Sequence, residues 1–287
     1  MQTCDNIEQL RSKIKAWRAN NESVAFVPTM GNLHDGHISL VELARERAQH
    51  VVVSIYVNPL QFAPHEDFDS YPRTLQDDLD KLAAVDTDLV FTPDTSLIYP
   101  QGERENTFVE VPELSDILEG EFRPGFFRGV ATVVLKLFNM VQPDIAVFGE
   151  KDFQQLLVIR RMVEELDLPI EIVGAPIIRE TDGLAMSSRN RYLDEDARAR
   201  SRLLSETLAS FCDQIRQGVS VEKAEQEAVR KLEAEGFSVD YVSLREVTQL
   251  RQIGADELEN TPELVVLAAA KVGSTRLIDN MKFTLSN

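Results

Sequence analysis

Short apolar runs alternate with helix-periodic segments through the first part of the chain. Each run is continuous and rich in β-branched or aromatic residues, as expected of strands that are buried on both faces of a sheet. The runs are Val24–Val27, Val51–Val57, Leu89–Phe91, Ile145–Phe148 and Ile170–Val173. Two stripes at helical spacing lie between them: Ile38, Val41, Ala44 and Ala48, and Leu156, Ile159, Val163 and Leu166. This alternation predicts βαβ units and a doubly wound α/β domain with a parallel sheet.

The pattern changes after Ile178. Two amphipathic helices are predicted first, near Asp194–Gln217 and Val221–Glu235, and strand-like runs follow. These runs are Val239–Leu244, Glu263–Val272 and Arg276–Phe283. Helices followed by consecutive strands indicate a small α+β unit with an antiparallel sheet. The predicted domains are therefore residues 1–177 and 178–287, in keeping with a length of 287 residues and about 150 residues per domain.

The charge balance narrows the classes of ligand. Lys and Arg number 30 against 48 Asp and Glu, a formal net charge of −18. Nucleic acids and anionic membranes both require a basic face, so neither is an expected partner. A small anion remains compatible, because charges are screened over about 8 Å at physiological salt and a few local cations can bind it.

The remaining composition favours a cytoplasmic protein. No apolar run approaches the roughly 20 residues that span a bilayer. The first residues lack the basic and apolar regions of a secretory signal. Two cysteines far apart in the sequence, Cys4 and Cys212, form no disulfide framework and fit a reducing compartment.

A glycine-bearing loop with two of the four histidines follows the first strand run. Residues 28–37 read Pro-Thr-Met-Gly-Asn-Leu-His-Asp-Gly-His. Ligands of open parallel sheets bind beyond the carboxyl ends of the strands, and a helix N-terminus offers free N–H donors to an anion. His34 and His37 are spaced to face one bound group. Two alternatives remain: histidines that only cap a helix or fill a turn, and a zinc site, although no other Cys or His is conveniently spaced to complete one.

Two later segments carry further candidate phosphate ligands. Gly149–Gln155 follows the fourth strand run, and Lys151, Asp152 and Gln155 are expected to open the next helix. A Lys at this place suits a phosphate, whereas an Asp favourable to the helix dipole beside a solvated Lys is the alternative. Gly183–Arg191 combines hydroxyls, backbone amides and arginines that suit a polyphosphate. Its alternative is a linker to the helix near Asp194.

Five segments in this order resemble the pantothenate synthetase family of ATP-dependent pantoate–beta-alanine ligases. They are residues 28–37, Tyr-Val-Asn-Pro-Leu-Gln-Phe (56–62), Tyr-Pro-Arg-Thr (71–74), Phe-Gly-Glu-Lys-Asp-Phe-Gln-Gln (148–155) and Met-Ser-Ser-Arg-Asn-Arg-Tyr-Leu (186–193). The resemblance covers essentially the whole chain. It implies a Rossmann-like fold akin to nucleotidylyltransferases and class I aminoacyl-tRNA synthetases, whose His-x-Gly-His motif residues 34–37 resemble.

The resemblance implies a reaction in two steps. The pantoate carboxylate attacks the α-phosphorus of ATP and gives pantoyl adenylate and pyrophosphate. The amine of beta-alanine then attacks the acyl carbon and releases AMP and pantothenate. Donors fixed around the α-phosphoryl oxygens would bind the transition state preferentially, because negative charge builds there.

The resemblance also implies the site residues. The catalytic residues are His34, His37, Lys151 and Arg189. The ATP-binding residues are Met30, Gly31, Asn32, Leu33, His34, Asp35, Gly36, His37, Gly149, Glu150, Lys151, Asp152, Ile178, Met186, Ser187, Ser188 and Arg189. The residues for pantoate and beta-alanine are Gln61 and Gln155, with Asn58, Tyr71 and Arg123 aligned near the site.

A metal, a lid and a dimer complete the expectations drawn from the family. Mg²⁺ is expected with ATP, and Asp77 is the candidate carboxylate ligand. Its alternative is a capping box, with Thr74 as N-cap and Asp77 at the third helical position. The polar segment 62–71 is the candidate water-excluding lid, and a homodimer is expected. Phe126 departs from the family, which often has His at this position, and no polar role is expected there.

Two other classes share parts of this pattern. A nucleotidylyltransferase acting on a phosphate ester would have the histidine loop but not Gln61 and Gln155, which suit a polar hydroxy acid. A nucleotide-sensing module on the same fold would need neither paired histidines nor a second phosphate loop.

Overall fold

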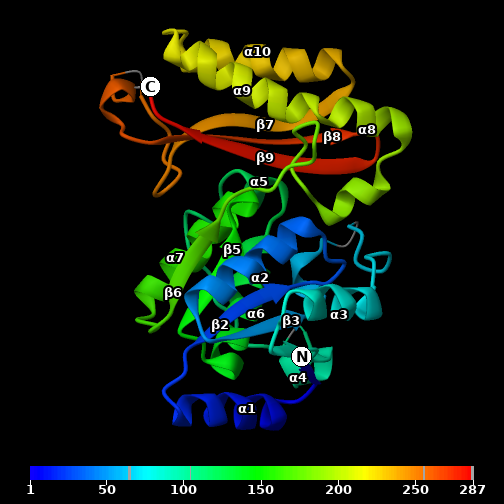
Figure 1. Ribbon diagram of the computed structural model, residues 1–287. Helices are drawn as coiled ribbons and strands as arrows, with labels where there is room; N and C mark the ends of the chain where they lie inside the picture. The colour runs from blue at the N-terminus through cyan, green and yellow to red at the C-terminus, as the bar shows by residue number, and fades with distance from the viewer. Residues whose placement is uncertain (64–65, 104, 255, 286–287) are drawn as a thin grey trace. The chain divides into compact units, whose positions relative to one another are not determined.

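The computed structural model describes residues 1–63, 66–103, 105–254 and 256–285. The chain folds into two compact units (Figure 1). Unit 1 comprises Met1–Glu150 and Gln155–Pro176. Unit 2 comprises Lys151–Gln154 and Ile177–Asn287.

Six parallel strands form the sheet of unit 1, in the order β1-β4-β3-β2-β5-β6. Their bounds are β1 Gln2–Cys4, β2 Val24–Thr29, β3 His50–Ile55, β4 Leu89–Phe91, β5 Ile145–Gly149 and β6 Glu171–Ala175. All five predicted runs form strands, and the doubly wound parallel sheet is confirmed. Strand β1 was not predicted, because this three-residue edge strand has no apolar run of its own.

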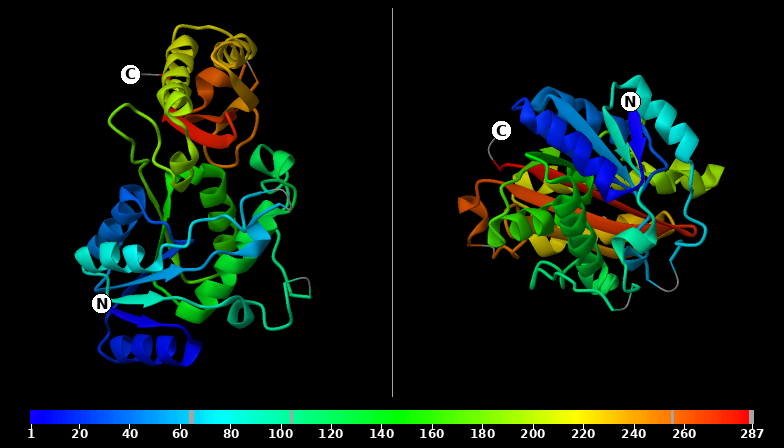
Figure 2. Two further views of the ribbon diagram at one scale, coloured as in Figure 1. Left: turned by 90° about the vertical axis from the view of Figure 1, so that its right-hand side faces the viewer. Right: turned by 90° about the horizontal axis from the view of Figure 1, so that it is seen from below.

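Helices cover both faces of this sheet (Figure 2). They are α1 Ile7–Ala19, α2 Asp35–Arg47, α3 Leu75–Ala84, α4 Thr95–Ile98, α5 Glu119–Phe122, α6 Phe126–Val141 and α7 Phe153–Glu165, with 3₁₀ turns η1 Pro59–Gln61 and η2 Glu150–Asp152. On one face, α2 and α3 bury Val41 and Leu82 against alternate strand residues. On the other, Phe138 of α6 makes edge-to-face contacts with Phe26 and Phe148, each at 6.3 Å. Leu166, predicted on the apolar stripe of α7, lies just beyond that helix and is 47% exposed.

The strand order places a topological switch point between β2 and β5. From β2 the chain builds outward through β3 and β4 on one side, and through β5 and β6 on the other. The connections that follow β2 and β5 lead to opposite sides of the sheet, so a crevice for a ligand is expected between the carboxyl ends of these two strands. The histidine loop leaves β2 at this point, and Gly149 ends β5 beside it.

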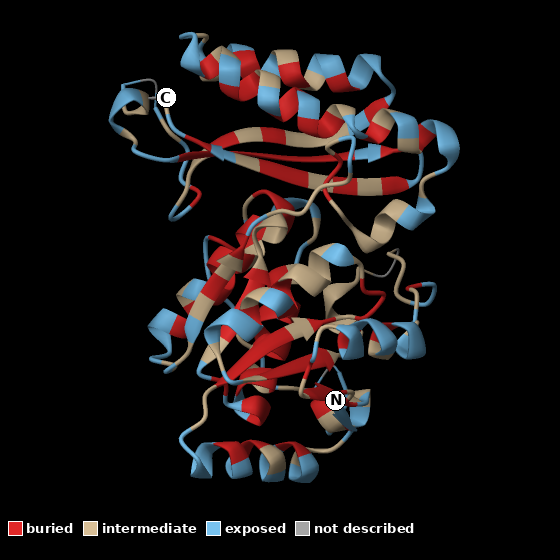
Figure 3. Cartoon of the chain, in the orientation of Figure 1, coloured by how far each residue is buried: buried red, intermediate tan, exposed pale blue. Residues whose placement is uncertain are grey.

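Unit 2 is an antiparallel sheet covered by helices. Its strands are β7 Phe237–Glu246, β8 Leu264–Val272 and β9 Thr275–Phe283, in that order across the sheet. Its helices are α8 Glu195–Ser201, α9 Leu203–Arg216 and α10 Val221–Ala234, with 3₁₀ turns η3 Ser188–Tyr192 and η4 Leu258–Asn260. The single helix predicted over Asp194–Gln217 is therefore wrong, since the chain forms α8 and α9 with a junction at Arg202. The buried faces of α9 and α10 pack on the sheet (Figure 3).

None of the helices in the described part of the chain is long and apolar enough to cross a membrane.

Candidate active site

The histidine loop begins with two tight contacts at the end of β2. The Thr29 hydroxyl donates to the Ser54 carbonyl at 2.8 Å and accepts the Gly31 N–H at 3.2 Å. Gly31 has φ +77°, and a Cβ there would lie 3.0 Å from Oδ2 of Asp78. Glycine is thus required both for the left-handed backbone and for the close approach of α3.

Asp78 of α3 anchors this loop, and the sequence did not single it out. Its side chain is only 1% exposed and accepts the backbone N–H of Asn32 at 2.9 Å and of Leu33 at 2.8 Å. The Thr74 hydroxyl donates to the same carboxylate at 3.2 Å. One turn further along α3, Lys81 Nζ donates to the Leu33 carbonyl at 2.6 Å. Helix α3 therefore fixes the loop by both a carboxylate and an ammonium group.

The two histidines stand together at the start of α2. His34 is the N-cap residue, and its backbone N–H donates to Nδ1 of His37 at 3.3 Å. The rings lie 4.1 Å apart between centroids with a tilt of 44°, and both side chains are partly exposed. Because Nδ1 accepts, a neutral His37 carries its proton on Nε2. His34 therefore occupies the N-cap position, and its backbone N–H fixes the orientation of the His37 ring.

The other loop positions support this arrangement. Asp35 is exposed in the first turn of α2, where a carboxylate is favourable to the helix dipole. The Gly36 carbonyl accepts the Ser39 hydroxyl at 3.0 Å, and Met30 is partly buried before the glycine. Asn32 adopts φ +51° and is 4% exposed.

A second cluster of hydrogen-bonded polar side chains in unit 1 is centred on Asn58, which is 1% exposed. Its amide Nδ2 donates to Oε1 of Gln61 at 3.0 Å and to the Gly129 carbonyl at 3.2 Å. The hydroxyl of Tyr99 donates to Oδ1 of Asn58 at 2.7 Å. This bonding fixes the orientation of the Gln61 amide, with Oε1 turned toward Asn58 and Nε2 turned away from it. Burial raises the pKa of Tyr99, so its hydroxyl remains a donor across the working pH range.

Arg123 contacts both the segment that follows η1 and the start of α6. Its guanidinium bonds Glu66 at 2.7 and 2.8 Å and donates to the Gln61 carbonyl at 3.0 Å. It also lies 3.7 Å from the ring centroid of Phe126. The aromatic residue at position 126 therefore serves as a stacking surface for Arg123.

The predicted lid, residues 62–71, is an aromatic cluster in its described part. Phe62 lies 5.3 Å from Phe68 and 5.6 Å from Tyr71, between ring centroids. Tyr71 is 5% exposed. Pro64 and His65, within the predicted lid, lie outside the described residues.

The segment after β5 differs in one respect from the prediction. Lys151 and Asp152 were expected to open the helix, but they lie in the 3₁₀ turn η2, and of the three predicted residues only Gln155 is on α7. The cause is local, since the chain makes one tight turn before the helix begins at Phe153. Gly149, Glu150 and Gln155 belong to unit 1 and are partly buried.

Within unit 2, Lys151 lies on a segment held by β9. Its side chain is 19% exposed, with Nζ 3.9 Å from Oδ2 of Asp152. The Asn280 amide donates to the backbone carbonyl of Lys151 at 2.9 Å. The ammonium group is therefore carried on a backbone that the sheet of unit 2 fixes.

The third predicted segment forms a short hairpin in unit 2. Arg179 and Ala185 pair as an antiparallel bridge, and the Met186 N–H donates to the Ile178 carbonyl at 3.0 Å. Ser187 is the N-cap of η3, and its hydroxyl accepts the Arg189 N–H at 3.3 Å. Ser187, Ser188 and Arg189 are partly exposed. The segment is thus an ordered loop with its own hydrogen bonds rather than a plain linker to α8.

Asp77 lies apart from these contacts. It is exposed in the first turn of α3, at the third helical position after the N-cap Thr74. The capping box is wrong in detail, because Thr74 makes no side-chain cap bond and its hydroxyl instead donates to Asp78. Among the residues that the structure describes, no three His, Cys, Asp or Glu side chains group as a metal site.

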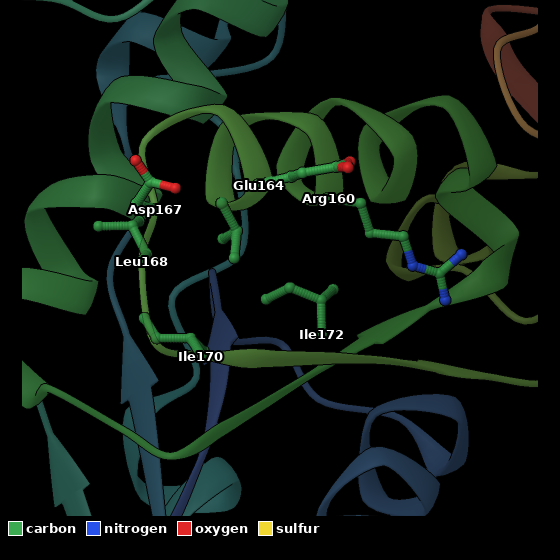
Figure 4. Close-up of a pocket in the computed structure, with 7 residues that line it drawn as sticks. Arg160, Glu164, Asp167, Leu168, Ile170 and Ile172 are labelled. Atoms are coloured by element: carbon green, nitrogen blue, oxygen red, sulfur yellow. The ribbon is translucent and has the colours of Figure 1, made fainter.

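A cavity of about 570 Å³ opens elsewhere in unit 1 (Figure 4). It is lined by Arg160 and Glu164 of α7, by Asp167 beyond the end of that helix, and by Ile170 and Ile172 beside and within the start of β6. This is the amino end of the strand, opposite the edge where the histidine loop lies. No predicted site residue lines it, so it is not the active site.

Curated relatives match the chain along its whole length. The pantothenate synthetase of Shewanella sp. (strain MR-7) is 53% identical over 283 residues, covering 99% of each chain. That of Shewanella amazonensis is 54% identical over 284 residues, covering 99% of this chain and all of the relative.

Solved structures also match the chain along essentially its whole length. The pantothenate synthetase of Thermus thermophilus superposes with a TM-score of 0.89 at 42% identity, covering 98% of this chain and 99% of that one. The pantoate-beta-alanine ligase of Francisella tularensis, solved with beta-gamma ATP and beta-alanine, gives 0.82 at 33% identity and covers 100% of this chain and 98% of that one.

The switch point of the parallel sheet and its His-x-Gly-His loop define a Rossmann-like class of nucleotide-binding enzyme. A family model described as pantoate-beta-alanine ligase matches residues 2–282. The chain belongs to the pantoate–beta-alanine ligase family, and the resemblance drawn from its five segments is confirmed. It is an AMP-forming ligase that condenses pantoate with beta-alanine to pantothenate at the expense of ATP, through pantoyl adenylate and with release of pyrophosphate. This membership excludes the phosphate-ester transferase and the sensing module.

Proposed function

We propose that the histidine loop supplies the donors for adenylation of pantoate. The observation that carries this proposal is the bond from the His34 N–H to Nδ1 of His37, which orients the ring and places the proton of a neutral His37 on Nε2. Asp78 fixes the loop before any ligand binds. A donor that is preorganised in this way stabilises the charge that grows on the α-phosphoryl oxygens without a reorganisation cost.

Gln61 and Gln155 hold pantoate in this proposal, and Gln61 also lies near beta-alanine. The Nε2 group of Gln61 is the donor that Asn58 leaves for the substrate. Arg123 supports the same residue from its carbonyl side, and Tyr71 closes the aromatic cluster beside it. Asn58, Arg123 and Tyr71 therefore shape the substrate site chiefly by holding Gln61 and the segment that follows it.

Unit 2 contributes the remaining phosphate ligands in this proposal. Lys151 contacts the phosphates, and Ser187, Ser188 and Arg189 hold the β- and γ-phosphates and ease the departure of pyrophosphate. Partial exposure of all four side chains and their ordered backbone support these roles. The nucleotide is bordered by the remaining expected residues: Gly149, Glu150, Asp152, Ile178 and Met186.

Magnesium enters with ATP in this proposal. Mg²⁺ in phosphate sites is held by one or two carboxylates together with substrate phosphates. Asp77 offers one exposed carboxylate at the start of α3, whereas Asp78 is engaged with the loop amides. A single carboxylate of this kind fits that donor set. When bound, the ion neutralises the repulsion among the phosphates.

The rate advantage comes mainly from positioning. A carboxylate held against the phosphorus gains from orientation, which is worth about 7–11 kcal/mol in well-aligned intramolecular reactions. Closure of the segment at 62–71 keeps water from the acyl adenylate. We assign pantoate binding and the larger part of ATP binding to residues 1–177. Residues 178–287 are assigned the function of a lid that carries the Ser187–Arg189 phosphate loop. A cytoplasmic homodimer is also expected.

Isotope exchange between pyrophosphate and ATP tests this site. We expect exchange that requires pantoate but not beta-alanine, followed by AMP release when beta-alanine is added. His37→Ala should lower exchange at least about 100-fold, and His37→Gln, which restores a donor near Nε2, should recover part of it. Equal exchange by His37→Ala and the unaltered protein would refute the assignment of the donor.

A further inference from the structure

Two adjacent residues of β9 hold both phosphate-binding segments of unit 2. Asp279 and Asn280 are each 3% exposed. Asn280 Nδ2 donates to the carbonyl of Lys151 at 2.9 Å. The Asp279 carboxylate binds Arg179, the residue that pairs with Ala185 at the base of the hairpin before Ser187.

The ion pair between Arg179 and Asp279 is a bidentate one. Nη1 and Nη2 of Arg179 lie 2.7 and 3.0 Å from the two carboxylate oxygens, and the Asp279 side chain is 2% exposed. The same guanidinium donates to the Gly183 carbonyl at 3.0 Å and to the Asn280 carbonyl at 3.3 Å. It therefore joins the turn of the hairpin to the backbone of β9. Bidentate pairs of this kind fix geometry as well as adding energy.

The strand geometry explains how one dipeptide reaches two segments. Consecutive side chains of a strand point to opposite faces. Asp279 pairs across the sheet with Ala268, which belongs to the core under α9 and α10, and Asn280 pairs with Leu267. Strand β9 is itself held along its length by β8. The dipeptide is thus a rigid base for both segments.

We infer that Asp279 and Asn280 are positioning residues. They fix the position of Lys151 relative to the Ser187–Arg189 loop, so that both segments can bind the triphosphate together. The inference rests on the proposed phosphate roles of these two segments. A triphosphate accepts hydrogen bonds at several oxygens at once, so the protein donors must already be held at the right distances from one another when it binds. AMP lacks the β- and γ-phosphates, so its binding should not depend on that spacing.

The first test removes one donor without emptying the site. Asn280→Asp keeps Oδ1 and loses the amide group that bonds the Lys151 carbonyl, and Asn280→Ala is a second variant. The matched control is Asp240→Asn, which breaks the ion pair at 2.7 Å between Arg276 of β9 and Asp240 of β7. We expect about a 10- to 100-fold loss of kcat/KM for ATP in pyrophosphate exchange, the scale of a displaced positioning group. AMP affinity should stay unchanged, and the control should keep its exchange rate.

A double-mutant cycle with Lys151→Ala separates this inference from the proposed function. If Asn280 acts through Lys151, the double variant loses no more exchange activity than Lys151→Ala alone. Impaired exchange in Lys151→Ala with normal exchange in both Asn280 variants would overturn the inference and leave the proposed function standing. Normal exchange in Lys151→Ala would overturn both. Equal losses of ATP and AMP binding in folded Asn280 variants would show a general structural role and would also overturn the inference.

Discussion

Replacing Asp78 by Asn should damage catalysis through the histidine loop without touching a histidine. The carboxylate accepts two backbone N–H groups, from Asn32 and Leu33, at 2.9 and 2.8 Å. The side-chain amide of Asn has the same shape, but its oxygen can accept only one of these two N–H groups. Its NH₂ group, which is itself a donor, would face the other N–H. One charge-assisted bond is lost, which is worth about 1.5–3 kcal/mol, and a buried N–H is left facing a donor.

We therefore expect a loss of about 2–3 kcal/mol in the free energy of unfolding, within the range for one charge-assisted bond, and a fall in Tm on the order of 5–10 °C. The loop should also shift, and a displacement of about 1 Å at a reacting group can cost about 100-fold in rate. Urea unfolding measures the first effect. Pyrophosphate exchange, assayed well below the Tm of the variant, measures the second.

The control is Asp80→Asn, which changes an exposed carboxylate two residues along α3 that bonds only Gln76 among the contacts described. This variant should keep its stability and its exchange rate. Asp78→Asn with unaltered exchange, in a protein that folds, would refute the argument that this carboxylate holds the histidines in place.

Three further predictions follow from the same geometry. Alanine substitution should lower pyrophosphate exchange at least about 100-fold, the scale for one preorganised donor, at each of three positions: His34, His37 and Lys151. Tyr99→Phe should raise the KM for pantoate several-fold, because Asn58 loses one donor worth about 1 kcal/mol and no longer fixes Gln61; an unchanged KM would contradict this. Burial raises the pKa of Glu225 above its value of 4.5 in the unfolded chain. The buried carboxylate therefore lowers the free energy of unfolding at pH 7, where it is charged, but not below pH 4.5, where it is protonated in both states. Glu225→Gln should therefore raise the Tm at pH 7 and have no effect near pH 4, as thermal scans at both pH values would show.

The strands and the histidine loop were predictable because their signals are local. Five apolar runs became five strands, since burial on both faces demands continuous apolar sequence. The loop between β2 and α2 was visible from its glycines and histidines. The junction between α8 and α9 at Arg202 was missed, because buried positions continue across it at helical spacing, from Ala197 and Ser201 to Leu204 and Leu208.

The supporting residues could not be predicted, because their partners are distant in the sequence. Asp78 bonds amides about 45 positions away, and Asn280 bonds a carbonyl 129 positions away. Tyr99 reaches Asn58 across 41 positions. A buried polar residue carries no periodic signal that names its partner. One weak signal was available, since an Asp next to Asp77 in the first turn of a helix invites the question of which of the two faces inward.

The central claim is that His37 presents its Nε2–H, fixed by the backbone of His34, to the α-phosphate of ATP. A crystal structure of the protein with a non-hydrolysable ATP analogue and pantoate tests it directly. We predict Nε2 of His37 within about 3 Å of an α-phosphoryl oxygen, with Nδ1 still accepting from the His34 N–H. An α-phosphate bound away from both imidazole rings would contradict the account.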